Sequence, residues 1–135
     1  SWEQVERVAF MSVAARRVAE QHWPGPLTLV LPIAQEVGLV QGVCVHGEVA
    51  VRFSSSPLVQ ELTTAFGFPV VATSANLANQ PDSRSAEDVR AYNLQVDYII
   101  DGGRLLDSKP STVARVEDTG EIQVIRAGAI SLVSL

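Results

Sequence analysis

Four short segments of the chain place polar side chains beside a glycine or proline turn, next to an apolar run. They are residues 49–53, 72–77, 109–113 and 125–130. In open α/β sheets, ligands bind at such strand ends. Arginine in two of the segments can pair with a carboxylate or a phosphate through two parallel hydrogen bonds. Hydroxyl and amide groups in the other two can bind phosphate oxygens or a small polar ligand, so all four segments are candidates for a ligand-binding site.

Each segment also has an ordinary structural interpretation. Arg52 interrupts an alternating apolar run, and the pattern alone slightly favours an arginine on the solvent face of a strand. The hydroxyl and amide side chains of residues 72–77 are equally typical of Asx and serine turns. No single segment decides between the two interpretations.

Other kinds of catalytic site are not indicated. The sequence contains neither a Walker P-loop nor a glycine-rich dinucleotide motif after a strand. The two histidines, His22 at a predicted helix end and His46 in a predicted turn, favour surface roles over a metal site. Because Cys44 is the only cysteine, an intrachain disulfide is excluded. Cys44 is interpreted as a small buried hydrophobic residue. Asp101, before two glycines, is interpreted as a turn residue.

Length and composition predict a single domain over residues 1–135. Apolar residues make up 47% of the 135 residues, charged residues make up 19%, and the net charge is −5. These values are typical of a soluble globular fold and argue against non-specific binding of nucleic acid. The first residues lack a signal-peptide pattern and the apolar runs are shorter than a membrane span, so we expect a cytoplasmic protein.

Helices and strands are predicted to alternate early in the chain, with strands dominating later. This order indicates an open α/β sheet of mixed strand direction. The expected helices cover residues 2–22, 56–66 and 85–92, and Gly67 ends the second. The expected strands cover residues 27–32, 43–45, 49–53, 70–73, 98–101, 112–116 and 122–125.

Six segments, taken in order, resemble the YrdC-like family of threonylcarbamoyl-AMP synthases. The matching segments are residues 22–32, 49–52, 72–77, 100–103, 110–113 and 125–130. The resemblance implies a YrdC-like open twisted mixed β-sheet with flanking helices around a concave cavity. Family members carry a basic triphosphate-binding stretch in an N-terminal portion, and we expect this chain to be the larger C-terminal part without that portion.

The resemblance also implies a reaction in which L-threonine, bicarbonate and ATP give threonylcarbamoyl-adenylate and pyrophosphate for threonylcarbamoyladenosine (t6A) modification of tRNA. No side chain is expected to act as a covalent or acid–base catalyst, because such a displacement needs positioning and charge neutralisation most. A divalent cation, magnesium by expectation, would accompany the phosphates without a metal site made of side chains. The implied threonine-binding residues are Arg52, Ala72 and Ser111, with Thr112 a weaker candidate, and the implied nucleotide-binding residues are Ser74, Asn76 and Arg126.

The expected partners are ATP, L-threonine and bicarbonate, with tRNA or the tRNA threonylcarbamoyl-transferase complex downstream and no membrane. Two alternatives stay open. One is the related domain of hydrogenase-maturation carbamoyltransferases, which makes carbamoyl-adenylate. The other is a non-catalytic module that binds RNA or a protein partner through the same cavity, although the net charge of −5 argues against RNA.

Overall fold

The computed structural model describes residues 1–34, 42–106 and 109–133. The chain forms two compact units, one of residues 1–70 with 109–135 and the other of residues 71–108. The first unit contains a five-stranded sheet and three helices, and the second contains one short helix.

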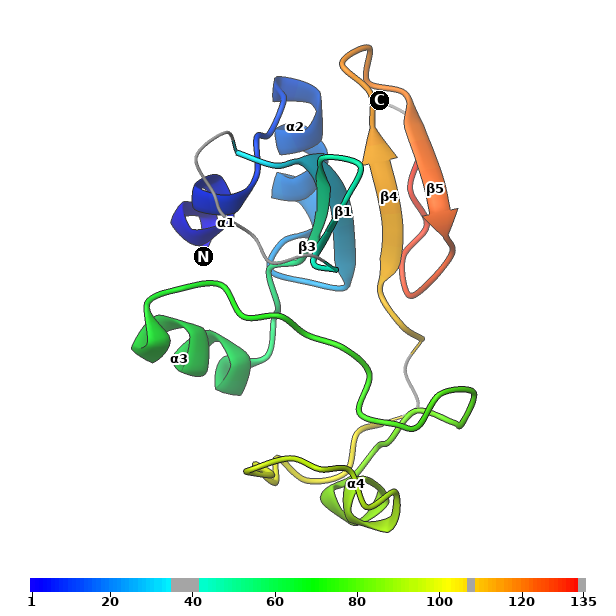
Figure 1. Cartoon of the computed structure of the whole chain (residues 1–135). Coiled ribbons are helices and arrows are strands. Elements are labelled where there is room, and N and C mark those ends of the chain that lie inside the picture. The colour runs from blue at the N-terminus through cyan, green and yellow to red at the C-terminus, as the bar shows by residue number, and fades with distance from the viewer. Residues whose placement is uncertain (35–41, 107–108, 134–135) are drawn as a thin grey trace. The chain divides into compact units, whose positions relative to one another are not determined.

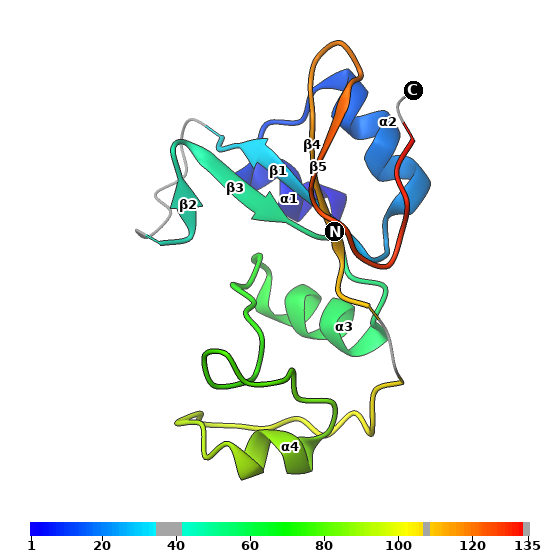
Figure 2. The ribbon, with the colours of Figure 1, turned by 90° about the vertical axis from the view of Figure 1, so that its right-hand side faces the viewer.

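The sheet has the strand order β2-β3-β1-β4-β5 (Figure 1 and Figure 2). Its central pair is parallel, with Leu27 of β1 opposite Thr112 of β4, and the other pairs are antiparallel. The mixed open α/β sheet predicted from the sequence is therefore confirmed. The strands are β1 (Leu27–Pro32), β2 (Cys44–Val45), β3 (Glu48–Val51), β4 (Thr112–Val116) and β5 (Ile122–Arg126).

One face of the sheet is covered by helices α1 (Trp2–Val8) and α2 (Val13–His22). Helix α2 contacts β1 and β4, and Figure 2 shows it beside β4. The alternate residues Leu27, Leu29 and Ala114 point to this side and are fully buried. Because side chains alternate along a strand, the opposite face carries Thr28, Val113 and their neighbours, which are only half-buried.

The predicted continuous helix over residues 2–22 is wrong, because residues 9–12 separate α1 from α2. Ala9 is extended (φ −139°, ψ 144°) and forms an antiparallel bridge with Ile33. The Phe10 N–H donates to the Pro32 carbonyl at 2.8 Å. Ser12 then starts α2 by accepting a hydrogen bond from the Ala15 N–H at 3.1 Å. Residues 9–12 thus form backbone hydrogen bonds with the end of β1 in place of one turn of helix.

Two local predictions around the sheet are largely confirmed. His46 and Gly47, with φ of 52° and 79°, form the two-residue turn between β2 and β3. Helix α3 (Pro57–Phe66) ends at Gly67 in the left-handed conformation, although the Ser56 side chain makes no capping hydrogen bond. Cys44 is half-buried rather than fully buried. Gly38 and Gly42 predict a loop over residues 34–42, which lies mostly outside the described residues.

The second unit contains helix α4 (Ala86–Ala91), with the predicted Ser85 cap accepting from the Asp88 N–H at 3.2 Å. The turn predicted at Asp101 is confirmed, since its Oδ1 accepts from the Gly103 N–H at 2.9 Å. The strands predicted at residues 70–73 and 98–101 are wrong, because neither segment has a strand partner among the described residues. Val71 and Tyr98 are 69% and 90% exposed, so an apolar run alone did not produce a buried strand.

Removing a core side chain from β1 should strongly destabilise the first unit. Leu29→Ala is expected to lower the free energy of unfolding by about 2–5 kcal/mol, because Leu29 is fully buried. Leu62→Ala is the matched control, since Leu62 on α3 is 46% exposed and its loss should cost much less. Urea denaturation followed by circular dichroism measures both, and equal losses would contradict the assigned core.

Candidate functional site

At one edge of the sheet in the first unit, β1 and β4 begin and β3 and β5 end. Because β3 and β5 run antiparallel to β1 and β4, the carboxyl ends of the first two lie beside the amino ends of the second two. Three predicted site residues lie here: Arg52 just after β3, Ser111 just before β4, and Arg126 at the end of β5. The sheet therefore brings together Arg52, Ser111 and Arg126 from distant parts of the sequence.

Strand register places these side chains on the face that α1 and α2 leave uncovered. Leu29 pairs with Val51, so the next step of the antiparallel register aligns Thr28 with Arg52. Thr28 itself pairs with Val113 across the parallel pair, and Ser111 is two residues before Val113 on the same face. The structure thus adds Thr28 to the residues of this site.

A bulge in β5 turns Arg126 toward the same face. Val124 pairs with Ala114 and Arg126 pairs with Val113, so β5 has one extra residue, Ile125, at this point. In a regular strand Arg126 would share the face of Val124, which is the helix-covered side. The extra residue reverses that orientation, as bulges characteristically do.

Ser111 is the centre of a side-chain network at this edge. Its side-chain oxygen lies 2.9 Å from Oγ1 of Thr28. Nη2 of Arg126 donates both to the Ser111 carbonyl oxygen at 2.9 Å and to Oγ at 3.2 Å. Ser111 is 9% exposed, so its hydroxyl is held in a defined position before any ligand arrives.

The backbone on each side of Ser111 is fixed by the chain that follows β5. The Ala129 N–H donates to the Pro110 carbonyl at 2.9 Å. Oγ1 of Thr112 donates to the Ile130 carbonyl at 2.6 Å and accepts from the Ile130 N–H at 3.2 Å. Thr112, the weaker threonine-binding candidate, is 1% exposed, and these bonds give it a structural role.

Arg52 is exposed, as its structural interpretation predicted, but its side chain is anchored. Its Nε donates to the Gly25 carbonyl at 3.0 Å, and the Gly25 N–H donates to the Phe53 carbonyl at 2.8 Å. The Trp23 indole N–H donates to the Leu27 carbonyl at 2.7 Å, which fixes the turn on which Gly25 lies. A bound carboxylate would therefore meet the terminal nitrogens of the guanidinium.

The other three predicted site residues, Ala72, Ser74 and Asn76, belong to the second unit. Ala72 and Ser74 are exposed, and the Ser74 carbonyl accepts from the Thr73 hydroxyl at 3.1 Å. Nδ2 of Asn76 donates to the Gln80 carbonyl at 2.6 Å. Oδ1 of Asn76 is buried with no hydrogen-bond partner among the described residues. This segment forms the side-chain-stabilised turn that its amide and hydroxyl groups indicated.

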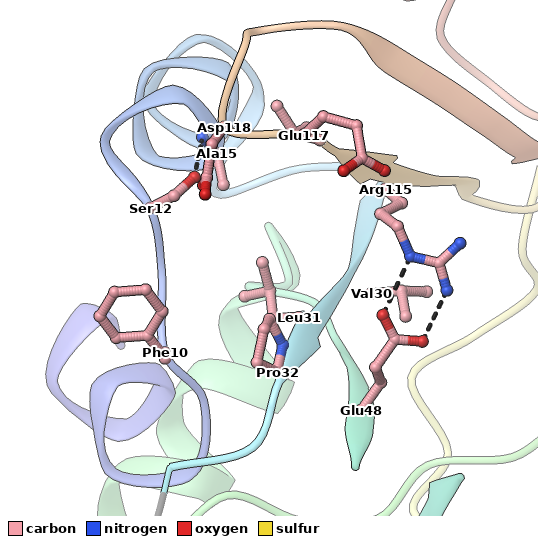
Figure 3. A pocket seen from close by; sticks show the side chains of 11 residues that line it. Phe10, Ser12, Ala15, Val30, Leu31, Pro32, Glu48, Arg115, Glu117 and Asp118 are labelled. Atoms are coloured by element: carbon pink, nitrogen blue, oxygen red, sulfur yellow. Dashed lines mark hydrogen bonds and ion pairs between the residues drawn. The ribbon is translucent and has the colours of Figure 1, made fainter. Parts of the chain in front are cut away.

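A separate pocket of about 230 Å³ lies toward the other end of β1 and β4 (Figure 3). Its lining includes Phe10, Glu48, Arg115 and Asp118, and it contains none of the predicted site residues. Arg115 binds both carboxylate oxygens of Glu48, with Nε–Oε1 2.9 Å and Nη2–Oε2 2.6 Å. These hydrogen bonds, more than the charge of Arg115, hold the pKa of Glu48 below its usual value.

The described residues contain neither a metal-binding cluster nor a membrane-spanning helix. No cluster of three or more His, Cys, Asp or Glu in this part of the chain could hold a metal ion. No helix in the same part is long and apolar enough to cross a membrane. The functional groups gathered at the sheet edge are arginines and hydroxyls, which are groups that bind anions.

Comparison with known proteins identifies the family. The model of the Sua5/YciO/YrdC family, described as "Telomere recombination", matches residues 1–128. The chain belongs to the Sua5/YciO/YrdC family. Curated relatives of this chain include proteins named threonylcarbamoyl-AMP synthase.

One curated relative and two solved structures illustrate the similarity to this family. The threonylcarbamoyl-AMP synthase of Chromohalobacter salexigens is 42% identical over 98 residues, covering 72% of this chain and 51% of the relative. The structure of P. abyssi Sua5 complexed with L-threonine is 33% identical with a TM-score of 0.80, covering 95% of this chain and 38% of that one. The structure of E. coli YciO is 30% identical with the same TM-score, covering 95% of this chain and 62% of that one.

The chain spans only part of the length of its relatives. It covers between 51% and 64% of the curated relatives it matches. The fold predicted from the YrdC-like resemblance is confirmed by the structural matches. The activity and substrates of the longer proteins are considered below as proposals for this chain.

The backbone at Gly128 packs so closely against residues 110–112 that it should not tolerate a side chain. A Cβ at Gly128 would lie 2.3 Å from the Pro110 carbonyl oxygen and 2.5 Å from the Thr112 nitrogen. Gly128→Ala should therefore lower the free energy of unfolding by about 3 kcal/mol. At Gly47 (φ +79°) nothing lies within 4 Å of such a Cβ, so Gly47→Ala should cost about 1 kcal/mol, from backbone strain alone. Urea denaturation compares the stabilities of the two variants. A larger loss of stability for Gly47→Ala would contradict the close packing of Gly128 on the backbone around Ser111.

The Glu48–Arg115 pair should make stability depend on pH in the acid range. The pKa of Glu48 is lower in the folded state than its ordinary value of 4.5. The ion pair therefore stabilises the fold at pH values above 4.5, and this stabilisation is lost as the pH falls through the folded pKa. Glu48→Gln should thus be less stable than the wild type near neutral pH, with most of the difference gone at the most acid pH. Urea midpoints measured across this range test the prediction, with Glu61→Gln on α3 as control. A difference that does not change with pH would contradict it.

Proposed function

We propose that this chain forms part of a threonylcarbamoyl-AMP synthase, acting in the cytoplasm on the pathway to t6A in tRNA. The observation that carries the proposal is the cluster of Arg52, Ser111 and Arg126 at one edge of the sheet, in a chain of the Sua5/YciO/YrdC family. A related solved structure is described as complexed with L-threonine, which supports an amino acid as one ligand. The names of the curated relatives favour threonine over the carbamoyl-adenylate alternative.

The proposed reaction has two steps. The threonine amine attacks bicarbonate to give a carbamate with loss of water. An oxygen of the carbamate then attacks the α-phosphate of ATP, the bond to the β-phosphate breaks, and pyrophosphate leaves. Neither step requires a covalent enzyme intermediate, so the contribution of the chain is to orient the reactants and neutralise their charge.

The roles proposed for individual residues follow from their chemistry and from the resemblance. Arg52 binds the threonine carboxylate through the terminal nitrogens of its guanidinium, and Ser111 positions the same amino acid. Arg126 is proposed to contact the nucleotide while holding Ser111. From the second unit, Ala72 is proposed for threonine binding and Ser74 and Asn76 for nucleotide binding.

A divalent cation is proposed to enter with the triphosphate. The side chains at the sheet edge are cationic or neutral, so the phosphate oxygens of ATP would supply the anionic ligands that Mg²⁺ prefers. When bound there, the cation neutralises charge on the phosphates during displacement. The arginines and hydroxyls of this chain orient the nucleotide around it.

Replacing Arg52 tests the proposed function. Arg52→Ala should weaken L-threonine binding by about 2 kcal/mol, or about 30-fold, because the carboxylate loses a charged partner. Arg17→Ala is the matched control, since Arg17 is exposed on α2 away from this edge. Isothermal titration calorimetry with L-threonine, in the presence and absence of ATP and magnesium, measures both variants. Threonine binding that is equal in wild type and Arg52→Ala would remove Arg52 from the site.

A further inference from the structure

The hydrogen bonds of the Ser111 hydroxyl restrict what it can offer a ligand. A serine hydroxyl has one proton and two acceptor positions, whereas an arginine nitrogen can only donate. Nη2 of Arg126 therefore occupies one acceptor position of Ser111 Oγ, at 3.2 Å. The remaining proton and lone pair are shared between Thr28, whose Oγ1 is 2.9 Å away, and any ligand at this edge.

Two arrangements of the Thr28–Ser111 pair are possible, since either oxygen can donate. If Ser111 donates to Thr28, its only proton is used within the protein. If Thr28 donates to Ser111, both acceptor positions of Ser111 are filled, and its proton points to a third group. The second arrangement leaves a nearly buried donor without a partner unless a ligand supplies an acceptor, which is costly in the empty site.

An anionic ligand favours the second arrangement. A carboxylate oxygen is a pure acceptor, and hydrogen bonds to a charged group are about twice as strong as neutral ones. The register also places Thr28 between Ser111, just before β4, and Arg52, just after β3, at the middle of the same edge. A carboxylate bound to Arg52 would therefore lie on the face from which Thr28 and Ser111 project.

We propose that Thr28 is a positioning residue that makes the Ser111 hydroxyl a hydrogen-bond donor to the carboxylate of the bound amino acid. This inference rests on the proposed function and deepens it. Thr28 acts through Ser111, and its contribution is larger with ligands that bring an anionic acceptor. The hydroxyl pair thereby favours an acid over its amide.

The test compares L-threonine with L-threoninamide, which lacks the carboxylate, by calorimetry in the presence of ATP. Thr28→Val removes the hydroxyl and keeps a β-branched side chain suited to a strand, whereas Thr28→Ser keeps the hydroxyl. Thr28→Val should weaken L-threonine binding about tenfold, because Ser111 loses the donor that fills its second acceptor position and polarises its proton toward the carboxylate. L-threoninamide binding should weaken only about threefold, because its carbonyl is a neutral acceptor. Thr28→Ser should restore the preference for L-threonine. Thr64→Val, at an exposed threonine on α3, is the matched control.

The outcomes separate this inference from the proposed function. An unchanged acid-to-amide ratio in Thr28→Val, with L-threonine binding lost in Ser111→Ala, overturns the role of Thr28 alone. If Thr28→Val and Thr28→Ser both weaken the binding of L-threonine and L-threoninamide equally, Thr28 has only a structural role. That result also overturns the positioning role of Thr28. Absence of L-threonine binding to the wild type, or binding insensitive to both Arg52→Ala and Ser111→Ala, overturns the proposed function together with this inference. Urea midpoints of all variants monitor folding.

Discussion

The parallel pairing of β1 with β4 is the interaction on which the first unit depends. It joins Leu27–Leu29 to Thr112–Ala114, and nothing else in the strand order connects β2 and β3 to β5. The fully buried Leu27, Leu29 and Ala114 lie on this pair, beneath α2. The hairpin of β2 and β3, helix α3 and the whole second unit lie between the two strands in sequence. Hydrophobic burial on one face thus fixes the register that forms the site on the other.

The sequence pattern predicted elements whose signals are local. Helix α3 has proline at its start and glycine after its end, and the strands β1, β4 and β5 are apolar runs bounded by turn residues. Errors arose where tertiary contacts overrode the pattern. The break after Val8 depends on backbone bonds to the end of β1, which helical periodicity cannot reveal. The apolar runs near Val71 and Tyr98 have no strand partner among the described residues, and β-propensity without a partner gives no strand.

Residue types in the site were predictable, but their arrangement was not. Arg52, Ser111 and Arg126 could be nominated because arginines and hydroxyls next to turns are typical of anion sites. Thr28 was missed as a site residue because it lies inside the apolar run of β1, where a polar residue at an alternate position was the one available signal. The orientation of Arg126 depends on a bulge that leaves no mark in the sequence.

The same bulge has a consequence for the solubility of the folded unit. β5 is an edge strand, and its Val124 and Ile125 are 45% and 51% exposed, a combination that invites another chain to add a strand. Ile125 interrupts the regular spacing of backbone donors and acceptors, and Arg126 adds a charge directly after it. A strand from another chain could pair with only a short part of β5 before it reaches the bulge at Ile125. The feature that orients an arginine into the site therefore also protects the sheet against aggregation along its edge.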